Sequence, residues 1–201
     1  MNKAGNKLGT ALSKILLISG PSGVGKGTVV SEVMRSHPNV FELSVSSTTR
    51  PRRSSETAGS HYHFHSKQEF EEQIRKQQLL EWVQFDDNYY GTLKSSLASI
   101  FGNGRIPLLE LEIQGAVAAR ANGYDGLYIY LKPPSMEELE RRIRKRGQNT
   151  EESIARRMRK ARDQEDEFLK HSKAFDVVVV NESLPASLSK INELVSKRLL
   201  N

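Results

Sequence analysis

The chain has 201 residues, of which 37% are hydrophobic and none is cysteine, and it carries 30 Lys and Arg against 24 Asp and Glu. This length suits one domain with at most a small insertion, and the composition excludes a disordered acidic chain, a disulfide framework and a zinc–thiolate site. The longest apolar runs, at 15–18 and 177–180, are far shorter than the roughly 20 residues that span a membrane. We therefore expect a soluble cytoplasmic protein without membrane contact, beginning with a flexible segment over 1–14 that lacks the apolar centre of a secretory signal.

Strand-like and helix-like segments alternate along the chain. Short apolar runs without polar alternation are typical of buried parallel strands, and they predict strands at 14–19, 41–45, 106–112, 127–131 and 176–180. Helical patterns occur at 28–35, 67–78, 135–146, 150–170 and 185–200. This alternation predicts an α/β fold with a five-stranded parallel sheet flanked by helices. The strand-like segments at 61–65 and 81–85 are shorter and more polar, so we expect 46–92 to form an insertion with its own small sheet.

A glycine-rich turn follows the first predicted strand and opens the first helix. It reads Gly20-Pro21-Ser22-Gly23-Val24-Gly25-Lys26-Gly27-Thr28, which in this setting predicts a P-loop that binds a nucleoside triphosphate. The glycines let backbone N–H groups surround phosphate oxygens, the helix N-terminus adds positive charge, and Lys26 reaches the outer phosphates. Gly27 stands where a Ser or Thr hydroxyl normally meets Mg²⁺, and Thr28 is the nearest hydroxyl. We expect the metal to rely largely on water and on the substrate phosphates.

A second signal for phosphate binding lies within the predicted insertion. Arg50, Arg52 and Arg53 follow a run of hydroxyl-bearing residues, and guanidinium groups match phosphate oxygens in pairs. Three further motifs follow along the chain: Ser44-Val-Ser-Ser-Thr-Thr-Arg50 with Arg53, Glu56, Gly59 and Tyr62; Glu81-Trp82; and Asn88-Tyr-Tyr-Gly-Thr92. Through these motifs the chain resembles the guanylate kinase family from about 15 to 199. The resemblance implies a P-loop nucleoside triphosphate hydrolase-like fold. It also implies Mg²⁺-dependent transfer of the ATP γ-phosphoryl group to GMP or dGMP, giving ADP and GDP, in purine nucleotide metabolism.

The resemblance also implies roles for residues of the insertion. Arg50, Arg53, Tyr62 and Tyr90 would hold the GMP phosphate, Glu81 would accept the guanine N1–H and exocyclic amine, and Ser46 and Thr92 would donate to guanine O6 or N7. Adenine would leave Glu81 facing an acceptor, a misfit that is costly in a buried site. The family reads Arg-x-Pro-Arg where this chain reads Arg50-Pro51-Arg52-Arg53. The spacing to the later motif residues favours Arg53 as the second clamp, with Arg52 left open as a substitute.

Two acidic residues end the third buried strand. The family places this strand end beside the P-loop, which implies that Glu110 or Glu112 orients Mg²⁺ through water or contacts the nucleotide. We assign Glu110 to the metal and Glu112 to GMP. The alternative is a pair of acids that simply cap a strand.

A basic segment over 141–162 contains ten Lys and Arg but only two acidic residues, Glu151 and Glu152. It lacks the aromatic residues that would stack on RNA bases, so we expect no nucleic acid partner. The segment resembles the lid of nucleoside monophosphate kinases, in which the arginines that match Arg146 and Arg157 close on the transferring phosphoryl group beside Lys26. Seven other basic residues are interpreted as solvated helix faces: Arg141, Arg142, Arg144, Lys145, Arg159, Lys160 and Arg162.

Asn181 ends the last predicted strand. The family places such an asparagine near the adenine of ATP, although a plain strand terminator is an equal alternative. With the P-loop residues 20–28 it completes the implied ATP site.

The resemblance implies a single domain over 15–201, divided into a core (15–45, 93–140 and 163–201), a GMP-binding insertion (46–92) and a lid (141–162). Its partners would be the small molecules ATP and GMP, and a homo-oligomer is possible. The alternative function is a catalytically inactive guanylate kinase-like module that binds proteins. Such modules typically lose P-loop or lid residues, whereas this chain keeps Lys26, Arg146 and Arg157.

Overall fold

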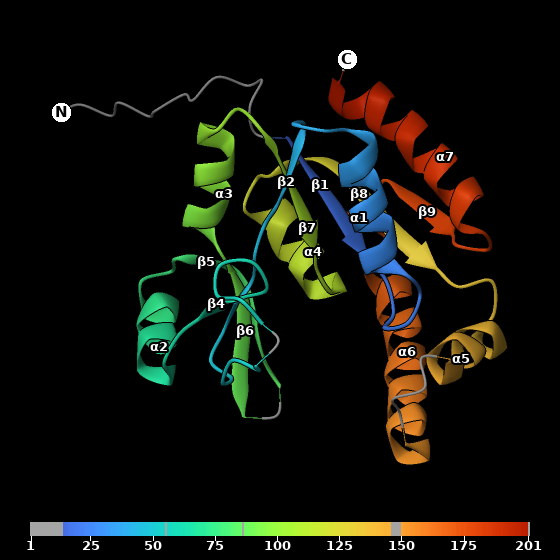
Figure 1. Cartoon of the computed structure of the whole chain (residues 1–201), viewed down its shortest axis with the longest axis horizontal. Coiled ribbons are helices and arrows are strands. Elements are labelled where there is room, and N and C mark those ends of the chain that lie inside the picture. Colours follow the sequence, from blue (N-terminus) through green and yellow to red (C-terminus); the bar gives the residue numbers. More distant parts are fainter. Residues whose placement is uncertain (1–13, 55, 86, 146–149, 201) are drawn as a thin grey trace.

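A computed structural model describes residues 14–54, 56–85, 87–145 and 150–200. Its central sheet has five parallel strands in the order β2-β7-β1-β8-β9 (Figure 1). These strands are β1 (Lys14–Ser19), β2 (Phe41–Leu43), β7 (Ile106–Glu110), β8 (Asp125–Lys132) and β9 (Val177–Val180). Leu16 in the central strand pairs with Leu108 on one side and Leu127 on the other. The predicted five-stranded parallel α/β fold is therefore confirmed.

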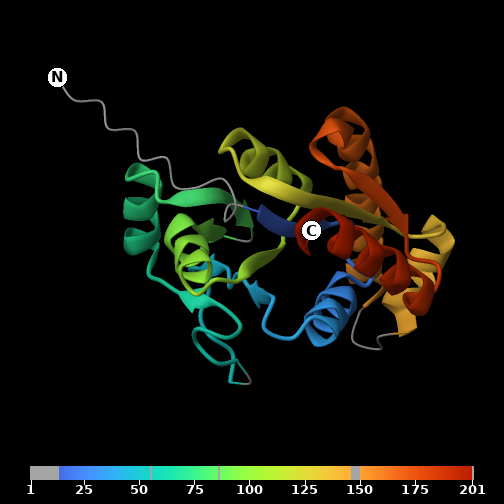
Figure 2. The same cartoon turned by 90° about the horizontal axis from the view of Figure 1, so that it is seen from above.

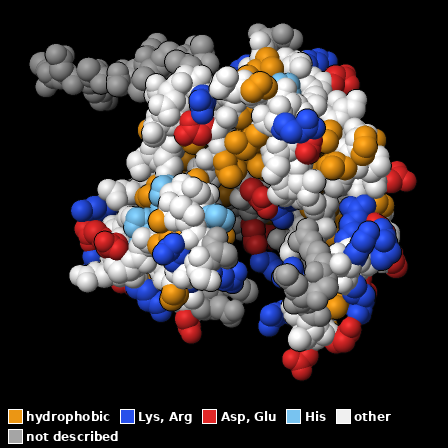
Figure 3. Space-filling view, in the orientation of Figure 1, with side chains coloured by type: hydrophobic (Ala, Val, Ile, Leu, Met, Phe, Trp, Pro, Cys, Tyr) orange, Lys and Arg blue, Asp and Glu red, His pale blue; other side chains and the backbone are white. Residues whose placement is uncertain are grey.

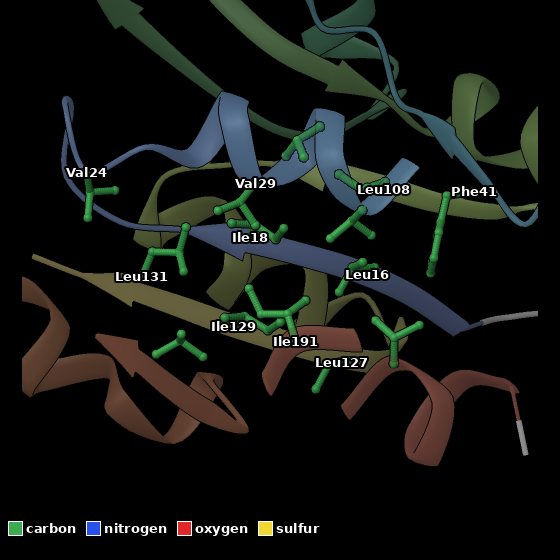
Figure 4. Close-up of a cluster of buried hydrophobic side chains, with 14 of the residues drawn as sticks. Leu16, Ile18, Val24, Val29, Phe41, Leu108, Leu127, Ile129, Leu131 and Ile191 are labelled. Atoms are coloured by element: carbon green, nitrogen blue, oxygen red, sulfur yellow. The ribbon is translucent and has the colours of Figure 1, made fainter. Parts of the chain in front are cut away.

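Helices cover both faces of this sheet, because successive residues of a strand point to opposite sides. Leu16 and Ile18 pack against α1 (Lys26–Ser36) and α7 (Leu184–Val195), in the cluster drawn in Figure 4. Ile15 and Leu17 face α3 (Lys94–Gly102) and α4 (Ile113–Ala121). Figure 2 shows α1 and α7 on one side of the sheet and α4 on the other. β1 is therefore buried on both faces, which explains its unbroken apolar sequence.

A second sheet of four strands lies apart from the first, in the order β4-β3-β6-β5. Its strands are β3 (Ser47–Thr48), β4 (His63–Phe64), β5 (Leu79–Phe85) and β6 (Asn88–Leu93). α2 (Lys67–Arg75) packs on this sheet and begins with a capping box between Ser66 and Glu69. Figure 1 shows the second sheet with α2 below the central sheet, opposite α5 (Met136–Lys145) and α6 (Glu151–His171). The chain thus forms two arms beneath the carboxyl ends of the central strands.

The sequence analysis identified neither α3 nor α4 as separate helices. Both are nine residues long, and their N-cap residues, Leu93 and Glu112, make no capping hydrogen bond through their side chains. The usual start signal of a helix is therefore missing, and these helices are stabilised by packing against the sheet. By contrast, Thr150 caps α6 by accepting a hydrogen bond from the Ser153 N–H, and the predicted start of that helix is correct.

The chain ends in a 3₁₀ turn (Ser172–Ala174), β9, α7 and a π-helical turn (Ser196–Leu200). No helix in the described ranges has both the length and the apolar character needed to cross a membrane. The predicted flexible segment, apart from Lys14, lies outside the described residues, and so does Arg146.

Candidate active site

The P-loop forms the turn between β1 and α1, at the carboxyl edge of the central sheet. Its backbone needs glycine: Gly20 has a φ of 145°, and a Cβ atom there would lie 2.3 Å from the Leu131 carbonyl oxygen. Gly25 is the N-cap of α1 with a φ of 106° and offers no side-chain cap, so the first N–H groups of the helix stay available to an anion. Lys26 folds back across this turn and donates hydrogen bonds to the carbonyl oxygens of Gly20 (2.7 Å) and Pro21 (3.3 Å).

A cleft of about 550 Å³ opens in front of the P-loop. We call it the Lys26 cleft, and it is lined by Ser22, Lys26, Arg53, Glu110, Leu111, Glu112, Arg156, Arg157 and Lys160. Lys26 Nζ lies 3.8 Å from Glu110 Oε1 at the end of β7. Figure 3 shows the hollow between the two arms, with acidic and basic side chains exposed inside it. Five of the lining side chains are cationic and two are acidic, so the cleft suits a ligand with several negative charges.

Arg50 and Glu56 form a bidentate ion pair in the loop between β3 and β4. The Arg50 guanidinium donates to both carboxylate oxygens of Glu56, at 2.7 and 2.5 Å, and lies 5.1 Å from the centre of the Tyr62 ring. The hydrogen bond from Arg50, together with one from the Arg53 N–H, lowers the pKa of the Glu56 carboxyl to about 2. The loop is therefore closed by Glu56, which the sequence analysis used only as a marker of spacing.

Arg53 and Arg52 differ in where they point. Both are exposed, but Arg53 lines the Lys26 cleft, whereas Arg52 donates a hydrogen bond to the Glu56 carbonyl oxygen at 2.7 Å. Arg52 therefore stabilises the conformation of its own loop, and the geometry favours Arg53 as the residue available to a phosphate group.

A second cavity, of about 340 Å³, adjoins the Lys26 cleft. We call it the Glu81 cavity, and its lining includes five residues predicted to bind GMP: Ser46, Tyr62, Glu81, Tyr90 and Glu112. Thr92 is predicted to donate to guanine O6 or N7, but in the structure its single hydroxyl hydrogen is donated to Glu81 Oε1 at 2.8 Å. A Cβ atom at Gly115 would lie 3.2 Å from Glu81 Cγ, so the glycine leaves room for this carboxylate.

The Glu81 carboxyl is largely enclosed by protein. Burial raises its pKa above the ordinary value, and the negative charge of Glu112 adds to the effect, while the Thr92 hydrogen bond opposes it. Glu112 lines the same cavity. The cavity therefore presents hydrogen-bond acceptors on one wall and suits a flat polar group that carries adjacent N–H donors.

A third cavity, of about 330 Å³, lies on the other side of the P-loop and is called here the Asn181 cavity. The Asn181 amide donates to the Val24 carbonyl oxygen at 2.8 Å, and among the described residues nothing partners its buried Oδ1. Thr28 lines this cavity, whereas Gly27 faces Glu110, whose Oε2 would lie 3.9 Å from a Cβ atom there. The structure therefore does not bring Thr28 to Glu110, because adjacent helix residues point in different directions.

Three of the basic residues interpreted as solvated also line cavities, although Lys145 and Lys160 are exposed as predicted and Arg142 is half-buried. Arg142 and Lys145 line the Asn181 cavity, and Lys160 lines both the Glu81 cavity and the Lys26 cleft. Lys160 lies three residues after Arg157 on α6, a spacing that puts both on one face of the helix and could have identified it. Arg141 and Arg144 do form exposed ion pairs, with Glu138 and with Glu140 and Glu151.

Arg157 lies directly opposite the P-loop. Its guanidinium donates to the Ser22 hydroxyl at 3.4 Å. Arg157 thus reaches the P-loop across the Lys26 cleft, and the arm that carries it can act on a group held there.

Comparisons with known proteins agree with this arrangement. Residues 12–198 match the family model described as guanylate kinase. The chain is 43% identical to a guanylate kinase of Synechococcus sp. (strain JA-3-3Ab), over 90% of this chain and 82% of the relative. It is 42% identical to a guanylate kinase of Clostridium tetani, over 90% of this chain and 85% of the relative.

Two solved structures are also similar. The guanylate kinase of Anaplasma phagocytophilum superposes with a TM-score of 0.67 at 27% identity, over 93% of this chain and 86% of that protein. The SH3-kinase fragment of tight junction protein 3 superposes with a TM-score of 0.52 at 10% identity, over 92% of this chain and 57% of the fragment. The second likeness concerns the fold alone.

Proposed function

This chain belongs to the guanylate kinase family and is an ATP:GMP phosphotransferase, and we propose that it uses the Glu81 cavity for GMP, the Asn181 cavity for the adenosine of ATP and the Lys26 cleft for phosphoryl transfer. In this proposal 46–92 is the GMP-binding insertion, 141–162 is the lid, and 15–45, 93–140 and 163–201 form the core. The observation that carries the proposal is that the Glu81 cavity and the Lys26 cleft share the wall of Glu110, Leu111 and Glu112. A nucleotide whose base lies beside Glu81 can therefore extend its phosphate toward Lys26.

Glu81 recognises the base. Guanine presents its N1–H and its exocyclic amine side by side, and an ionised carboxylate accepts both hydrogen bonds. The Thr92 hydroxyl donates a hydrogen bond to one oxygen of Glu81, and this bond orients the carboxylate toward the base. Ser46 lines the same cavity and can donate to guanine O6 or N7, while Glu112 offers a further acceptor for the exocyclic amine. Adenine carries an unprotonated N1 in place of the N1–H and would oppose one acceptor with another.

The GMP phosphate is held at the mouth of this cavity. Two hydrogen bonds to Glu56 hold the Arg50 guanidinium beside the Tyr62 ring. This fixed position supports a role for Arg50 as a phosphate ligand that is oriented before GMP binds. Arg53 approaches from the Lys26 cleft, and the hydroxyls of Tyr62 and Tyr90 can donate to the remaining oxygens. The phosphate is thereby oriented with one oxygen toward the P-loop.

ATP lies with its phosphates against residues 20–28. The backbone N–H groups at the start of α1 bind phosphate oxygens, and the buried Oδ1 of Asn181 accepts a hydrogen bond from the adenine amine. Arg142 lines the same cavity, and its planar guanidinium can stack on the base. The nucleoside and the phosphates of ATP are then held on opposite sides of the glycine turn.

The acceptor needs no general base from the protein, because the GMP phosphate oxygen is already an anionic nucleophile. Transfer then depends on positioning and on neutralising charge, which Lys26 and Arg157 provide from opposite sides of the cleft. Arg146, which lies outside the described residues, is proposed as the second lid arginine.

The residues present fit a magnesium ion. Glu110 offers a carboxylate whose Oε1 lies 3.8 Å from Lys26 Nζ, and the glycine at 27 leaves space beside it. Mg²⁺ prefers such oxygen donors and commonly keeps several waters. Glu110 would hold the ion through water, without a P-loop hydroxyl, and the bound ion would supply charge neutralisation to the phosphates of ATP.

A coupled assay of ADP production with GMP, AMP, UMP and CMP as acceptors tests the proposal. We expect turnover with GMP and little with the other three, because only guanine offers two adjacent donors to Glu81. Equal turnover with AMP would refute the assignment of Glu81. The alternative of an inactive binding module predicts no turnover at all, and the retention of Lys26 and Arg157 in the cleft argues against it.

A further inference from the structure

Lys160 lies where the two substrate cavities meet. Four residues line both the Glu81 cavity and the Lys26 cleft, namely Glu110, Leu111, Glu112 and Lys160. The first three belong to the end of β7 and the start of α4, whereas Lys160 comes from α6 on the opposite arm. Lys160 is thus the cation of this shared wall, and it comes from the helix that also carries Arg157.

The Lys160 ammonium group contacts a carboxylate of the proposed GMP cavity. Lys160 Nζ donates to Glu112 Oε1 at 2.6 Å. Glu112 is the N-cap residue of α4, but its carboxylate makes no capping hydrogen bond. The position of that carboxylate is therefore determined largely by Lys160 and not by the helix that it precedes.

A purely structural role accounts poorly for this ion pair. The Lys160 side chain is 47% exposed and that of Glu112 is 53% exposed. Ion pairs with this much solvent contribute little net stability, since water screens the charges and two long side chains lose conformational freedom. A lysine in this position does more for the charge balance of the cavity than for the stability of the fold.

The charge balance matters because three carboxylates line one small cavity. Glu81, Glu110 and Glu112 all lie in the wall of the Glu81 cavity, and Tyr62, Tyr90 and Lys160 complete its ionisable lining. Like charges in a largely enclosed space repel each other, and the Glu112 charge disfavours ionisation of Glu81. Lys160 is the one cation among the described residues that line this cavity.

We propose that Lys160 is a positioning residue for GMP, which holds the Glu112 carboxylate at the wall of the Glu81 cavity and offsets the second negative charge beside Glu81. This inference rests on the proposed function, because it assigns the Glu81 cavity to GMP. It makes α6 part of the acceptor site as well as of the phosphate cleft. Loss of Lys160 then weakens GMP binding more than it affects ATP binding or the transfer step.

Lys160→Met tests this, with Arg159→Met as a matched control. Arg159 is the preceding residue on the same helix, carries the same charge, is exposed and lines neither cavity. We expect Lys160→Met to raise the KM for GMP about fivefold, the size expected for losing one half-exposed ion pair. The value of kcat and the KM for ATP should stay within about twofold of those of the parent protein. Lys160→Arg should restore the KM for GMP, and Arg159→Met should not change it.

Calorimetric titration of GMP without ATP separates this inference from the proposed function. A weaker affinity for GMP in Lys160→Met, together with the same thermal unfolding midpoint as the parent, supports the positioning role whether or not turnover is measured. The combined variant Lys160→Met/Glu112→Gln should lose no more affinity than Glu112→Gln alone, because the two residues act as a pair. A fall in kcat at unchanged KM for GMP, or equal effects of Lys160→Met and Arg159→Met, would overturn the inference while leaving GMP phosphorylation by the parent protein intact.

Discussion

Replacing the carboxylate of Glu81 by an amide changes a single heavy atom of the side chain that is proposed to recognise guanine. In Glu81→Gln the amide oxygen can keep the hydrogen bond from the Thr92 hydroxyl, which is 2.8 Å long in the parent protein. The amide nitrogen then faces a guanine N–H, so that a donor opposes a donor in a largely enclosed site. Gln occupies nearly the volume of Glu, so Gly115 and Leu111 need not move.

The expected loss of kcat/KM for GMP follows from the hydrogen bonds that the substitution removes. One charge-assisted hydrogen bond disappears and one buried donor remains unsatisfied, which costs about 2–4 kcal/mol. This corresponds to a loss of roughly 30- to 1000-fold in kcat/KM for GMP. ATP binding should hardly change, because the P-loop and the Asn181 cavity do not contact Glu81.

The assay compares kcat/KM for GMP and for AMP in the parent protein, in Glu81→Gln and in Glu71→Gln. The last variant makes the same chemical change at an exposed position of α2, so it controls for loss of a negative charge in the same arm. An unchanged preference for GMP in Glu81→Gln would refute the reasoning, because guanine would then be recognised by other residues.

The pH profile gives a second readout of the same group. Burial raises the pKa of Glu81 above the ordinary value of 4.5, so protonation begins at a higher pH than for an exposed glutamate. A protonated carboxyl no longer accepts both guanine donors. The KM for GMP should therefore rise as the pH falls toward this raised pKa in the parent protein, and it should show no such rise in Glu81→Gln.

The remaining predictions concern the P-loop, the arginine loop and the arms. Lys26→Ala should lower kcat by about 100-fold or more with an unchanged thermal unfolding midpoint, because Lys26 serves the transferring phosphates; near-normal turnover would contradict its role. Glu56→Gln should raise the KM for GMP by releasing Arg50. Because the pKa of Glu56 is lowered from 4.5 to about 2, its stabilising contribution is present above pH 4.5 and is lost toward pH 2. Acid unfolding followed by circular dichroism should therefore be steeper over that range in the parent than in Glu56→Gln, and identical curves would count against the ion pair. Binding of both nucleotides should bring the arms together, since Arg53 and Arg157 must reach one phosphoryl group. Labels on cysteines introduced at the exposed positions Lys67 and Asp163 should report a shorter distance with both nucleotides than with neither; an unchanged distance would exclude closure.

The errors of the sequence analysis have a common cause. Neither α3 nor α4 was identified, because neither carries a capping signal and packing against the sheet stabilises them. The strand β3 is two residues long, too short for a pattern to reveal, whereas β4 lies within the strand-like segment predicted at 61–65. The sequence analysis assigned Lys160, Arg142 and Lys145 to solvent alone, because a run of basic residues does not show which of them will also border a cavity.

The sequence by itself determined the parts of this protein that depend on adjacent residues. The parallel strands follow from unbroken apolar runs, and the P-loop follows from glycines and a lysine placed between a strand and a helix, because backbone geometry there is a local property. Contacts between particular side chains were decided only by the folded structure. Glu56 closes the loop around Arg50, Thr92 orients Glu81 across a strand pair, and Lys160 reaches Glu112 from 48 positions away in the chain. The last pairing depends on how α6 packs beside the central sheet, and hydrophobic burial supplies that information only when the whole chain is folded.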